Sequence, residues 1–300
     1  MIFRREPETD TFNLFGQHRI IDRHNYKDFM SSGLLGINVI NAVRPNSTIE
    51  MTHCDILAEQ SGKQIERDFD YKFNNYGHRC DDFDHTEKQH HIVFAGDSFA
   101  VGEGLPHMLN WCGLIHSSIS TDYGKCGYFV LGYSGGSVSF ITNNIYRYIS
   151  KFGNPTSLFI LLPESTRYFV IIDGEPIGVV ANTSDSMAHW GNIETAQHHA
   201  AQEMMKLELF CREAQIELIW SSWEQSDRES YKKYGFTNYA YYEEYEIEKY
   251  GNNEKFKNHK HYECSRDHAH PGIRYSDGMA NILMAAYRDK YEHPKIKFST

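Results

Sequence analysis

Short apolar runs alternate with amphipathic segments from residue 88 onward. The runs are typical of strands buried on both faces of a parallel sheet, and they cover residues 92–95, 128–131, 158–162 and 216–220. Between and after these runs, apolar residues recur at spacings of three and four, which predicts helices over residues 108–118, 138–149, 200–214 and 276–287, the last capped by Ser276. This alternation favours an α/β fold in which helices cover both faces of a parallel sheet.

Two further β elements are predicted outside this alternation. Residues 168–180 contain two β-rich runs joined by Asp173–Gly174, which is typical of a β-hairpin. Apolar residues in the segment 65–73 follow a two-residue period with one gap, which predicts an extended strand. We interpret residues 1–85 as an N-terminal extension that packs as scaffold on a core domain of residues 86–300.

Residues 225–265 interrupt the alternation with a segment rich in tyrosine and charge. Two interpretations of this insertion are open. Its EEYEIEK stretch contains good helix formers, which favours a solvated helical excursion. Its place before the last predicted helix favours a lid or substrate platform, because aromatic faces suit sugars and acyl chains. Under the second interpretation Tyr241 and Tyr242 are candidate substrate-binding residues, as is Tyr133 in the sequence GYSGGS.

The composition bears on partners and location. The chain has 40 Asp and Glu against 30 Lys and Arg, a formal net charge of −10, so we expect no nucleic acid partner. It has no apolar run of membrane-spanning length, and its N-terminal MIFRREPETD is charged where a signal peptide is apolar. We therefore expect no membrane partner and a cytoplasmic location. The six cysteines show no close pairing and are interpreted as free thiols.

Ser98 follows the apolar run 92–95 directly, in the sequence Gly96-Asp97-Ser98. A residue at the carboxyl end of a parallel strand, just before a helix, lies where open α/β sheets bind their ligands. Backbone N–H groups at such a turn are free to meet an oxyanion. The position suits a nucleophile, although a serine there is also typical of a helix N-cap.

A candidate base for this serine lies near the end of the chain, in Asp267-His268-Ala269-His270. An acid and a histidine three residues apart can point into one site from a single loop. A serine nucleophile needs such a base, and the base needs a group that fixes its tautomer. A competing interpretation makes Asp267, His268 and His270 the ligands of a transition metal, but it leaves the Gly-Asp-Ser turn unexplained.

Gly96-Asp97-Ser98 and Asp267-x-x-His270 resemble the first and last sequence blocks of the SGNH (GDSL-like) hydrolases. The resemblance implies a three-layer αβα sandwich with a flavodoxin-like parallel sheet. It implies that Ser98 is the nucleophile, His270 the general base and Asp267 the residue that orients this base. Gly135 matches the glycine whose N–H belongs to the oxyanion hole. The implied reaction is hydrolysis of an ester through an acyl-serine intermediate, without a metal or other cofactor.

The third block departs from this family. Where the family has Gly-x-Asn-Asp after the third strand, this chain has Pro163-Glu164-Ser165-Thr166. A hydroxyl can donate one hydrogen bond, so we predict that Ser165 replaces the asparagine beside the N–H groups of Ser98 and Gly135. The departure leaves a second function open, a binding module for a glycan or acyl ligand with weak or no turnover. For the enzyme we expect a small-molecule or glycan ester as substrate.

Overall fold

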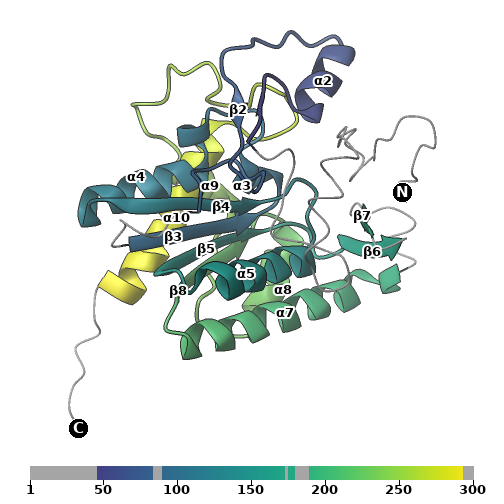
Figure 1. Cartoon of the computed structure of the whole chain (residues 1–300), viewed down its shortest axis with the longest axis vertical. Coiled ribbons are helices and arrows are strands. Elements are labelled where there is room, and N and C mark those ends of the chain that lie inside the picture. Colours follow the sequence, from purple (N-terminus) through teal and green to yellow (C-terminus); the bar gives the residue numbers. More distant parts are fainter. Residues whose placement is uncertain (1–45, 84–89, 173–174, 180–188, 293–300) are drawn as a thin grey trace.

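The centre of the molecule is a four-stranded parallel sheet (Figure 1). The computed structural model describes residues 46–83, 90–172, 175–179 and 189–292. The strands are β3 (His90–Gly96), β4 (Cys126–Gly132), β5 (Ser157–Leu162) and β8 (Glu217–Ser222), in the order β4-β3-β5-β8. Every neighbouring pair is parallel, and the first of the four strands lies between the second and the third, which is the flavodoxin-like order. The predicted parallel sheet is confirmed.

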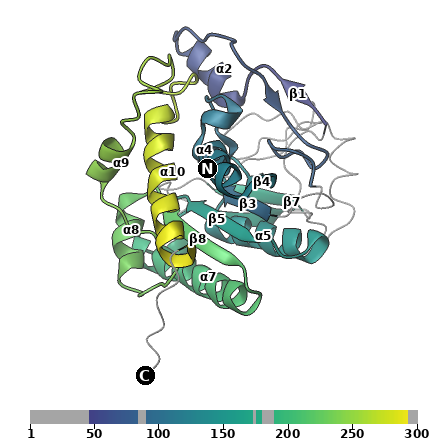
Figure 2. The same ribbon diagram turned by 90° about the vertical axis from the view of Figure 1, so that its left-hand side faces the viewer.

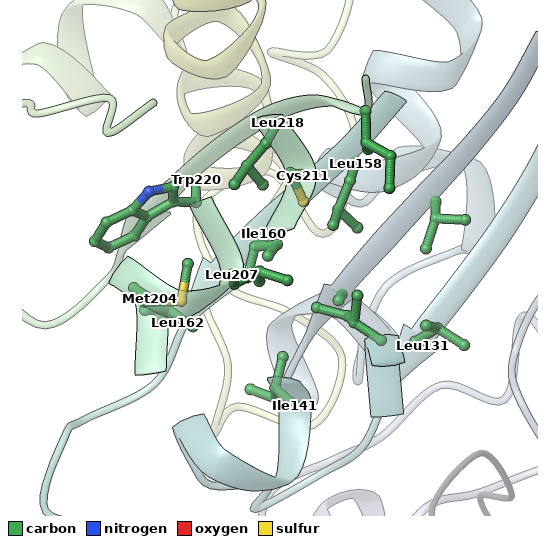
Figure 3. Close-up of a cluster of buried hydrophobic side chains, with 14 of the residues drawn as sticks. Leu131, Ile141, Leu158, Ile160, Leu162, Met204, Leu207, Cys211, Leu218 and Trp220 are labelled. Carbon is green, nitrogen blue, oxygen red and sulfur yellow. The ribbon is translucent and has the colours of Figure 1, made fainter. Parts of the chain in front are cut away.

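One face of this sheet is covered by α5 (Val138–Phe152) and α7 (Ile193–Glu213). Their apolar side chains form a single buried cluster with alternate residues of the strands (Figure 3). In it, Leu207 of α7 lies next to Ile160 of β5, and Cys211 of α7 lies near Leu218 of β8, all fully buried. The three- and four-residue spacings read from the sequence therefore place the apolar face of each helix on the sheet.

The opposite face is covered by α4 (Trp111–Tyr123), α9 (Glu244–Tyr250) and α10 (Ile273–Tyr287). Figure 2 shows α10 and α5 on opposite sides of the sheet. The three-layer αβα sandwich is thus confirmed. The predicted cap of the last helix is wrong, because α10 begins after Gly272 and Ser276 is a buried residue inside it. No helix within the described ranges has the length and apolarity needed to cross a bilayer.

Smaller elements lie around this core. The predicted hairpin is formed by β6 (Tyr168–Ile172) and β7 (Glu175–Val179), which pair antiparallel; its turn, 173–174, lies outside the described residues. The strand predicted over 65–73 is confined to β2 (Tyr71–Lys72), which pairs with β1 (Thr48–Ile49). The helix predicted from residue 108 begins later because Asn110 caps α4, accepting a hydrogen bond from Gly113 N at 2.8 Å. The remaining elements are α2 (His53–Gln60), α3 (Ser98–Val101), η2 (His107–Leu109), α8 (Gln225–Lys232) and η3 (Arg288–Glu292).

The Tyr-rich segment contains the helix that EEYEIEK predicts, α9, whose Tyr245 is 66% exposed, but other parts of the segment are buried in the core. Residues 238–240 run along the open edge of β8, where Trp220 N donates to Asn238 O and Ala240 N donates to Trp220 O. Tyr231 and Tyr242 are buried at 0% and 1% exposure. The tyrosine rings supply apolar surface to both core clusters, which a solvated excursion or a detachable lid would not do.

Candidate active site

The carboxyl ends of β3, β5 and β8 are tied together by the buried carboxylate of Asp97. One oxygen accepts a hydrogen bond from Phe99 N at 3.0 Å and so caps α3. The other accepts from Arg167 Nη1, which follows β5, at 3.1 Å, and from Trp223 Nε1, which follows β8, at 3.3 Å. Because Asp97 is the N-cap, Ser98 is not, and its hydroxyl is left for another role at a turn held by three strands.

The turn that carries Gly135 lies next to the Ser98 turn. Gly96 and Gly132 are partners in the ladder between β3 and β4, so the two chains leave the sheet side by side. Tyr133 N donates to Gly96 O at 3.1 Å, and Gly136 N closes the turn on Tyr133 O at 2.9 Å. Gly135 has φ +74°, a conformation that favours glycine. The sheet therefore places the two residues predicted to supply oxyanion N–H groups at adjacent strand ends.

Asp267 and His270 meet as the sequence predicts. His270 Nδ1 lies 2.8 Å from Asp267 Oδ2. The other oxygen of Asp267 accepts three further hydrogen bonds, from Ser265 Oγ at 2.5 Å, Ala269 N at 3.0 Å and His270 N at 3.1 Å. His268 adopts φ +52° in the turn between them and is exposed. The turn thus directs Asp267 and His270 toward each other and His268 outward.

This loop is joined to the chain that follows Ser98. Arg266 N donates to Gly104 O at 2.7 Å. Gly104 has φ +73°, and a Cβ there would lie 2.7 Å from Asp267 Oδ1, so a larger residue would displace the carboxylate. The ring of Phe99, the neighbour of Ser98, packs edge-on against the His270 ring at a centroid distance of 5.7 Å. The loop of Asp267 and His270 therefore lies against the chain that immediately follows Ser98.

The electrostatics of the pair favour a charged imidazole. Burial alone would lower the pKa of His270, but the hydrogen bond to Asp267 and the negative charges of Glu103, Asp267 and Asp97 raise it to about 9. Burial would raise the pKa of Asp267, yet the hydrogen bond from His270 holds it well below its usual range. At neutral pH the resting pair is an imidazolium next to a carboxylate.

The N-terminal segment supports this loop. The guanidinium of Arg266 is buried and binds both oxygens of Asp55 in α2, at 3.2 and 3.1 Å. It also donates to the carbonyls of Phe69 and Glu50, at 2.8 and 2.9 Å. Residues 46–83 therefore act as the predicted scaffold by binding the guanidinium of Arg266, next to Asp267. The domain division at residue 85 lies outside the described residues and stays a prediction.

Removing the partner of Arg266 is expected to destabilise the protein strongly. Asp55→Ala leaves a guanidinium buried without its counter-charge, which costs about 3–5 kcal/mol of unfolding free energy. Urea unfolding of the variant and of the unchanged protein measures this loss of unfolding free energy. Glu254→Ala is the matched control, because it removes an ion pair with Lys257 in which the side chains are 81% and 42% exposed, and its cost is below about 1 kcal/mol. Equal effects of the two substitutions would contradict the supporting role of Asp55.

Ser165 does not lie in the site as a hydrogen-bond donor. Its backbone N and its hydroxyl both donate to the buried carboxylate of Asp227 in α8, at 2.6 and 2.7 Å. A hydroxyl has one proton to donate, so the predicted replacement of the family's asparagine is not supported by this geometry. Gln197 donates to the same carboxylate at 3.0 Å. Ser165 instead fixes the β5–β6 connection to α8.

Ser165→Ala is accordingly expected to reduce stability and to leave turnover almost unchanged. It removes one hydrogen bond to a buried carboxylate, a loss of about 1–3 kcal/mol in unfolding free energy, while turnover of an ester falls less than about tenfold. Thr121→Ala, which removes an exposed hydroxyl on α4, changes stability by less than about 0.5 kcal/mol. A hundredfold loss of turnover with unchanged stability would restore Ser165 as an oxyanion donor.

The tyrosines predicted to bind substrate are engaged elsewhere. Tyr242 is 1% exposed and donates to Ser222 O, and Tyr133 is 6% exposed with its ring against Phe140. The hydroxyl of Tyr241 lies within hydrogen-bond distance of the carboxylates of Glu229 and Glu243 and can donate its one proton to either. Buried rings offer a ligand little surface, so these contacts do not support the assignment of Tyr133 and Tyr242 to substrate, which stays a prediction. The contacts of Tyr241 do not place it at the site.

A hollow of about 680 Å³ opens beside the loop that carries Asp267 and His270. Its lining includes Arg266 and His268 but neither Ser98 nor His270. Its basic residues are paired: Lys260, for example, contacts the carboxylates of Glu66 and Asp68. The hollow therefore has no evident surplus of positive charge for an anionic ligand.

The metal site predicted as an alternative is not formed by its predicted ligands. Within the described part of the chain, potential ligand atoms lie within 4.8 Å of one another in a group of Cys54, Glu103, Asp267 and His270, which lacks His268. The Asp267 carboxylate already accepts four hydrogen bonds, about as many as its lone pairs allow. A metal ion would have to break one of them, so the donor set fits a hydrogen-bonded triad better than a metal centre.

Two residues at the site escaped the sequence analysis. Trp223, which holds Asp97, follows the run 216–220 closely, and a tryptophan at a strand end was the available signal. Glu103 stands between Gly102 and Gly104. A charged residue between two glycines is typical of an exposed turn, yet the side chain of Glu103 is 0% exposed. Its Oε2 lies 4.0 Å from His270 Nε2, and its Oε1 accepts a hydrogen bond from the Ser134 hydroxyl.

Comparison with known proteins gives structural but not sequence relatives. No family model matches the chain, and no curated protein matches it. The chain is similar to the crystal structure of TesA, at 11% identity and a TM-score of 0.44 over 67% of this chain and 99% of that one. It is also similar to the psychrotrophic esterase EstA from Pseudoalteromonas sp., at 10% identity and a TM-score of 0.43 over 68% and 100%.

A third similar structure is that of a putative GDSL-like lipase from Parabacteroides merdae, at 14% identity and a TM-score of 0.38 over 68% of this chain and 97% of that one. In this chain itself, the strand order and the two motifs at the carboxyl edge of the sheet are as the sequence resemblance predicts. The fold is a three-layer αβα sandwich with a flavodoxin-like parallel sheet. What the chain does rests on the geometry of its site.

Proposed function

We propose that this protein is a serine hydrolase that cleaves an ester through an acyl-serine intermediate. Ser98 is the nucleophile, His270 the general base and Asp267 the residue that orients it. The observation that carries the proposal is the 2.8 Å hydrogen bond between His270 Nδ1 and Asp267 Oδ2, on a loop bonded through Arg266 N to Gly104, six residues after Ser98.

The proposed reaction uses these groups in two steps. His270 Nε2 takes the proton of the Ser98 hydroxyl while Ser98 Oγ bonds to the ester carbonyl carbon, and the same proton then passes to the leaving alcohol. Water attacks the acyl-serine in the second step, and His270 again takes and returns the proton. Asp267 stays ionised and holds the imidazole with Nε2 directed away from it, as its low pKa supports.

The negative oxygen of the tetrahedral intermediate is stabilised by the N–H groups of Ser98 and Gly135. The pairing of Gly96 with Gly132 supports their neighbourhood at the strand ends, and fixed N–H donors cost no reorganisation when the charge develops. With Ser165 turned to Asp227, the hole has two predicted donors. A small-molecule or glycan ester remains the proposed substrate class.

The pH dependence of hydrolysis tests the assignment of the base. Because the pKa of His270 is raised to about 9, the neutral imidazole that accepts the serine proton is the minor form at pH 7. We expect kcat/KM to rise about tenfold per pH unit below 9 and to level off above it. Initial rates on a short-chain ester in a pH-stat, corrected for alkaline background hydrolysis, measure this.

His268→Ala is the control for this profile, since its ring is exposed and its removal leaves the inflection in place. A rate that is flat or falling between pH 6 and 9 would contradict His270 as the base at this pKa.

The engagement of Ser165 favours a second candidate function, a module that binds a glycan or acyl ligand with weak or no turnover. Loss of one oxyanion donor costs about 10²–10³ in turnover. The two candidates differ in the reactivity of Ser98: an enzyme reacts with a fluorophosphonate, and a binding module does not.

A further inference from the structure

Glu103 lies in a turn, but its carboxylate is buried next to His270. Its side chain is fully buried, although it stands in the short connection after α3. Burying a carboxylate costs several kcal/mol unless a positive group or hydrogen bonds compensate. Its Oε1 is compensated by the hydroxyl of Ser134, the residue before Gly135. Its Oε2 faces the imidazole of His270, with 4.0 Å between Oε2 and Nε2.

We propose that Glu103 is a positioning residue that stabilises the protonated form of His270 from its Nε2 side, while its other oxygen holds Ser134 in the Gly135 turn. Asp267 contacts Nδ1, so the imidazolium lies between two carboxylates. The proposal rests on the proposed function for its catalytic meaning, because Nε2 is the nitrogen that exchanges protons with Ser98.

The other groups around His270 do not replace Glu103. The charge of Asp97 also raises the pKa of His270, but less than that of Glu103, and Arg167 contacts the Asp97 carboxylate at 3.1 Å. Cys54, from α2, completes the group of side chains within 4.8 Å. Arg79 is turned to carbonyls, with Nη1 donating to Gly102 O and Nη2 to Leu105 O. Glu103 is therefore the carboxylate that acts on the Nε2 edge.

The consequence is a coupling between the base and the oxyanion turn. A proton on Nε2 draws Glu103 Oε2, and Glu103 Oε1 accepts from Ser134, one residue before the glycine that donates to the oxyanion. The Glu103 carboxylate is thus already in place to stabilise the positive charge that forms on His270 when it takes the serine proton. Because the same carboxylate stabilises the imidazolium before the reaction, His270 releases its proton only in alkaline solution.

An NMR titration of histidine ring protons in the full chain tests the proposal without needing turnover. The signal of His270 is identified by its absence from His270→Asn. In Glu103→Gln, which keeps an acceptor for Ser134, we expect its midpoint to fall by about one to three pH units, the size expected for two charges 4 Å apart at an effective dielectric constant near 20. The inflection of the pH–rate profile falls by the same amount.

The matched control is Glu217→Gln. Glu217 also accepts a hydrogen bond from a serine, Ser157, at 2.8 Å, but at the amino end of β8 and so at the opposite edge of the sheet. Its substitution moves the His270 midpoint by less than about 0.3 pH unit, because more than a Debye length of separation screens the charge.

Two outcomes would overturn the proposal. One is an unchanged His270 midpoint in folded Glu103→Gln; the other, which needs no variant to fold, is a wild-type midpoint at or below 6.5, the ordinary value for histidine. A lowered midpoint in a protein that hydrolyses no ester and does not react at Ser98 would support the charge coupling and refute the proposed function, so the two failures are distinguishable.

Discussion

Ser98→Ala is expected to fold normally and to lose at least about 10³-fold in ester turnover, the scale at which removal of a triad member acts. Folding is spared because the N-cap of α3 is Asp97, whose carboxylate accepts from Phe99 N. The reaction is lost because no other hydroxyl on this turn can form the acyl-enzyme. Initial rates on a short-chain ester and a urea unfolding curve measure the two effects together.

Ser117→Ala is the control, because this serine is exposed on α4, and its turnover and stability stay close to those of the unchanged protein. If Ser98→Ala keeps more than about a tenth of the activity, the nucleophile is another residue.

Asp267→Asn has the second-largest expected effect, a loss of about 10³–10⁴-fold in kcat, as when the orienting aspartate of a triad is replaced by its amide. An asparagine has one acceptor oxygen, whereas Asp267 accepts hydrogen bonds on both of its oxygens, from His270 Nδ1 on one and Ser265 on the other. The amide therefore turns its NH2 group either toward His270 Nδ1 or toward the backbone N–H groups of Ala269 and His270. Either outcome turns the imidazole or changes its tautomer.

The substitution should also lower the midpoint of the pH–rate profile, because the hydrogen bond from Asp267 is a main cause of the raised pKa of His270. Asp122→Asn, which removes an exposed ion pair with Arg288 on the far end of α4, serves as control. A kcat within threefold of the unchanged protein in Asp267→Asn would mean that His270 is oriented by another group, and Glu103 would be the first to test.

The sheet could be predicted because its strands are buried on both faces. Such strands read as continuous apolar runs. Three runs lie within β3, β4 and β5 with one to three residues missed at their ends, and the fourth begins one residue before β8 and misses its last two residues. The pair of Asp267 and His270 could be predicted for a similar reason, since both are in one short loop. Local patterns carry information about contacts that are local.

The errors concern contacts that are distant in sequence. The sequence around Ser165 predicts a hydroxyl at the oxyanion hole, because it does not reveal that Asp227 of α8 accepts the proton of this hydroxyl. Tyr242 was predicted to bind substrate because a tyrosine ring is found both in cores and on surfaces. Its burial is revealed by the hydrogen bond from its hydroxyl to Ser222 O, a contact distant in sequence. The buried charge of Glu103 follows from the position of His270 near the other end of the chain, which the residues around Glu103 do not reveal.

The N-terminal segment illustrates the same limit at a larger scale. Its weak patterning favoured plain scaffold, yet Asp55 fixes the residue next to Asp267, and Tyr71 links the two parts of the site by donating to Asp55 and accepting from Gly104 N, at 3.0 and 2.9 Å. Buried polar networks of this kind specify one arrangement of loops when every member is satisfied. The loop of Asp267 and His270 is therefore held by residues that lie more than 150 positions earlier in the chain.

The most direct measurement of the central claim is the site of covalent modification by a fluorophosphonate. The protein is treated with the probe at pH 9, near the raised pKa of His270, then digested and mapped by mass spectrometry. We predict a single adduct on Ser98 in the unchanged protein, slow labelling in His270→Ala and none in Ser98→Ala. An adduct on another residue, or no adduct at all in the folded protein, would contradict a Ser98 nucleophile activated by His270.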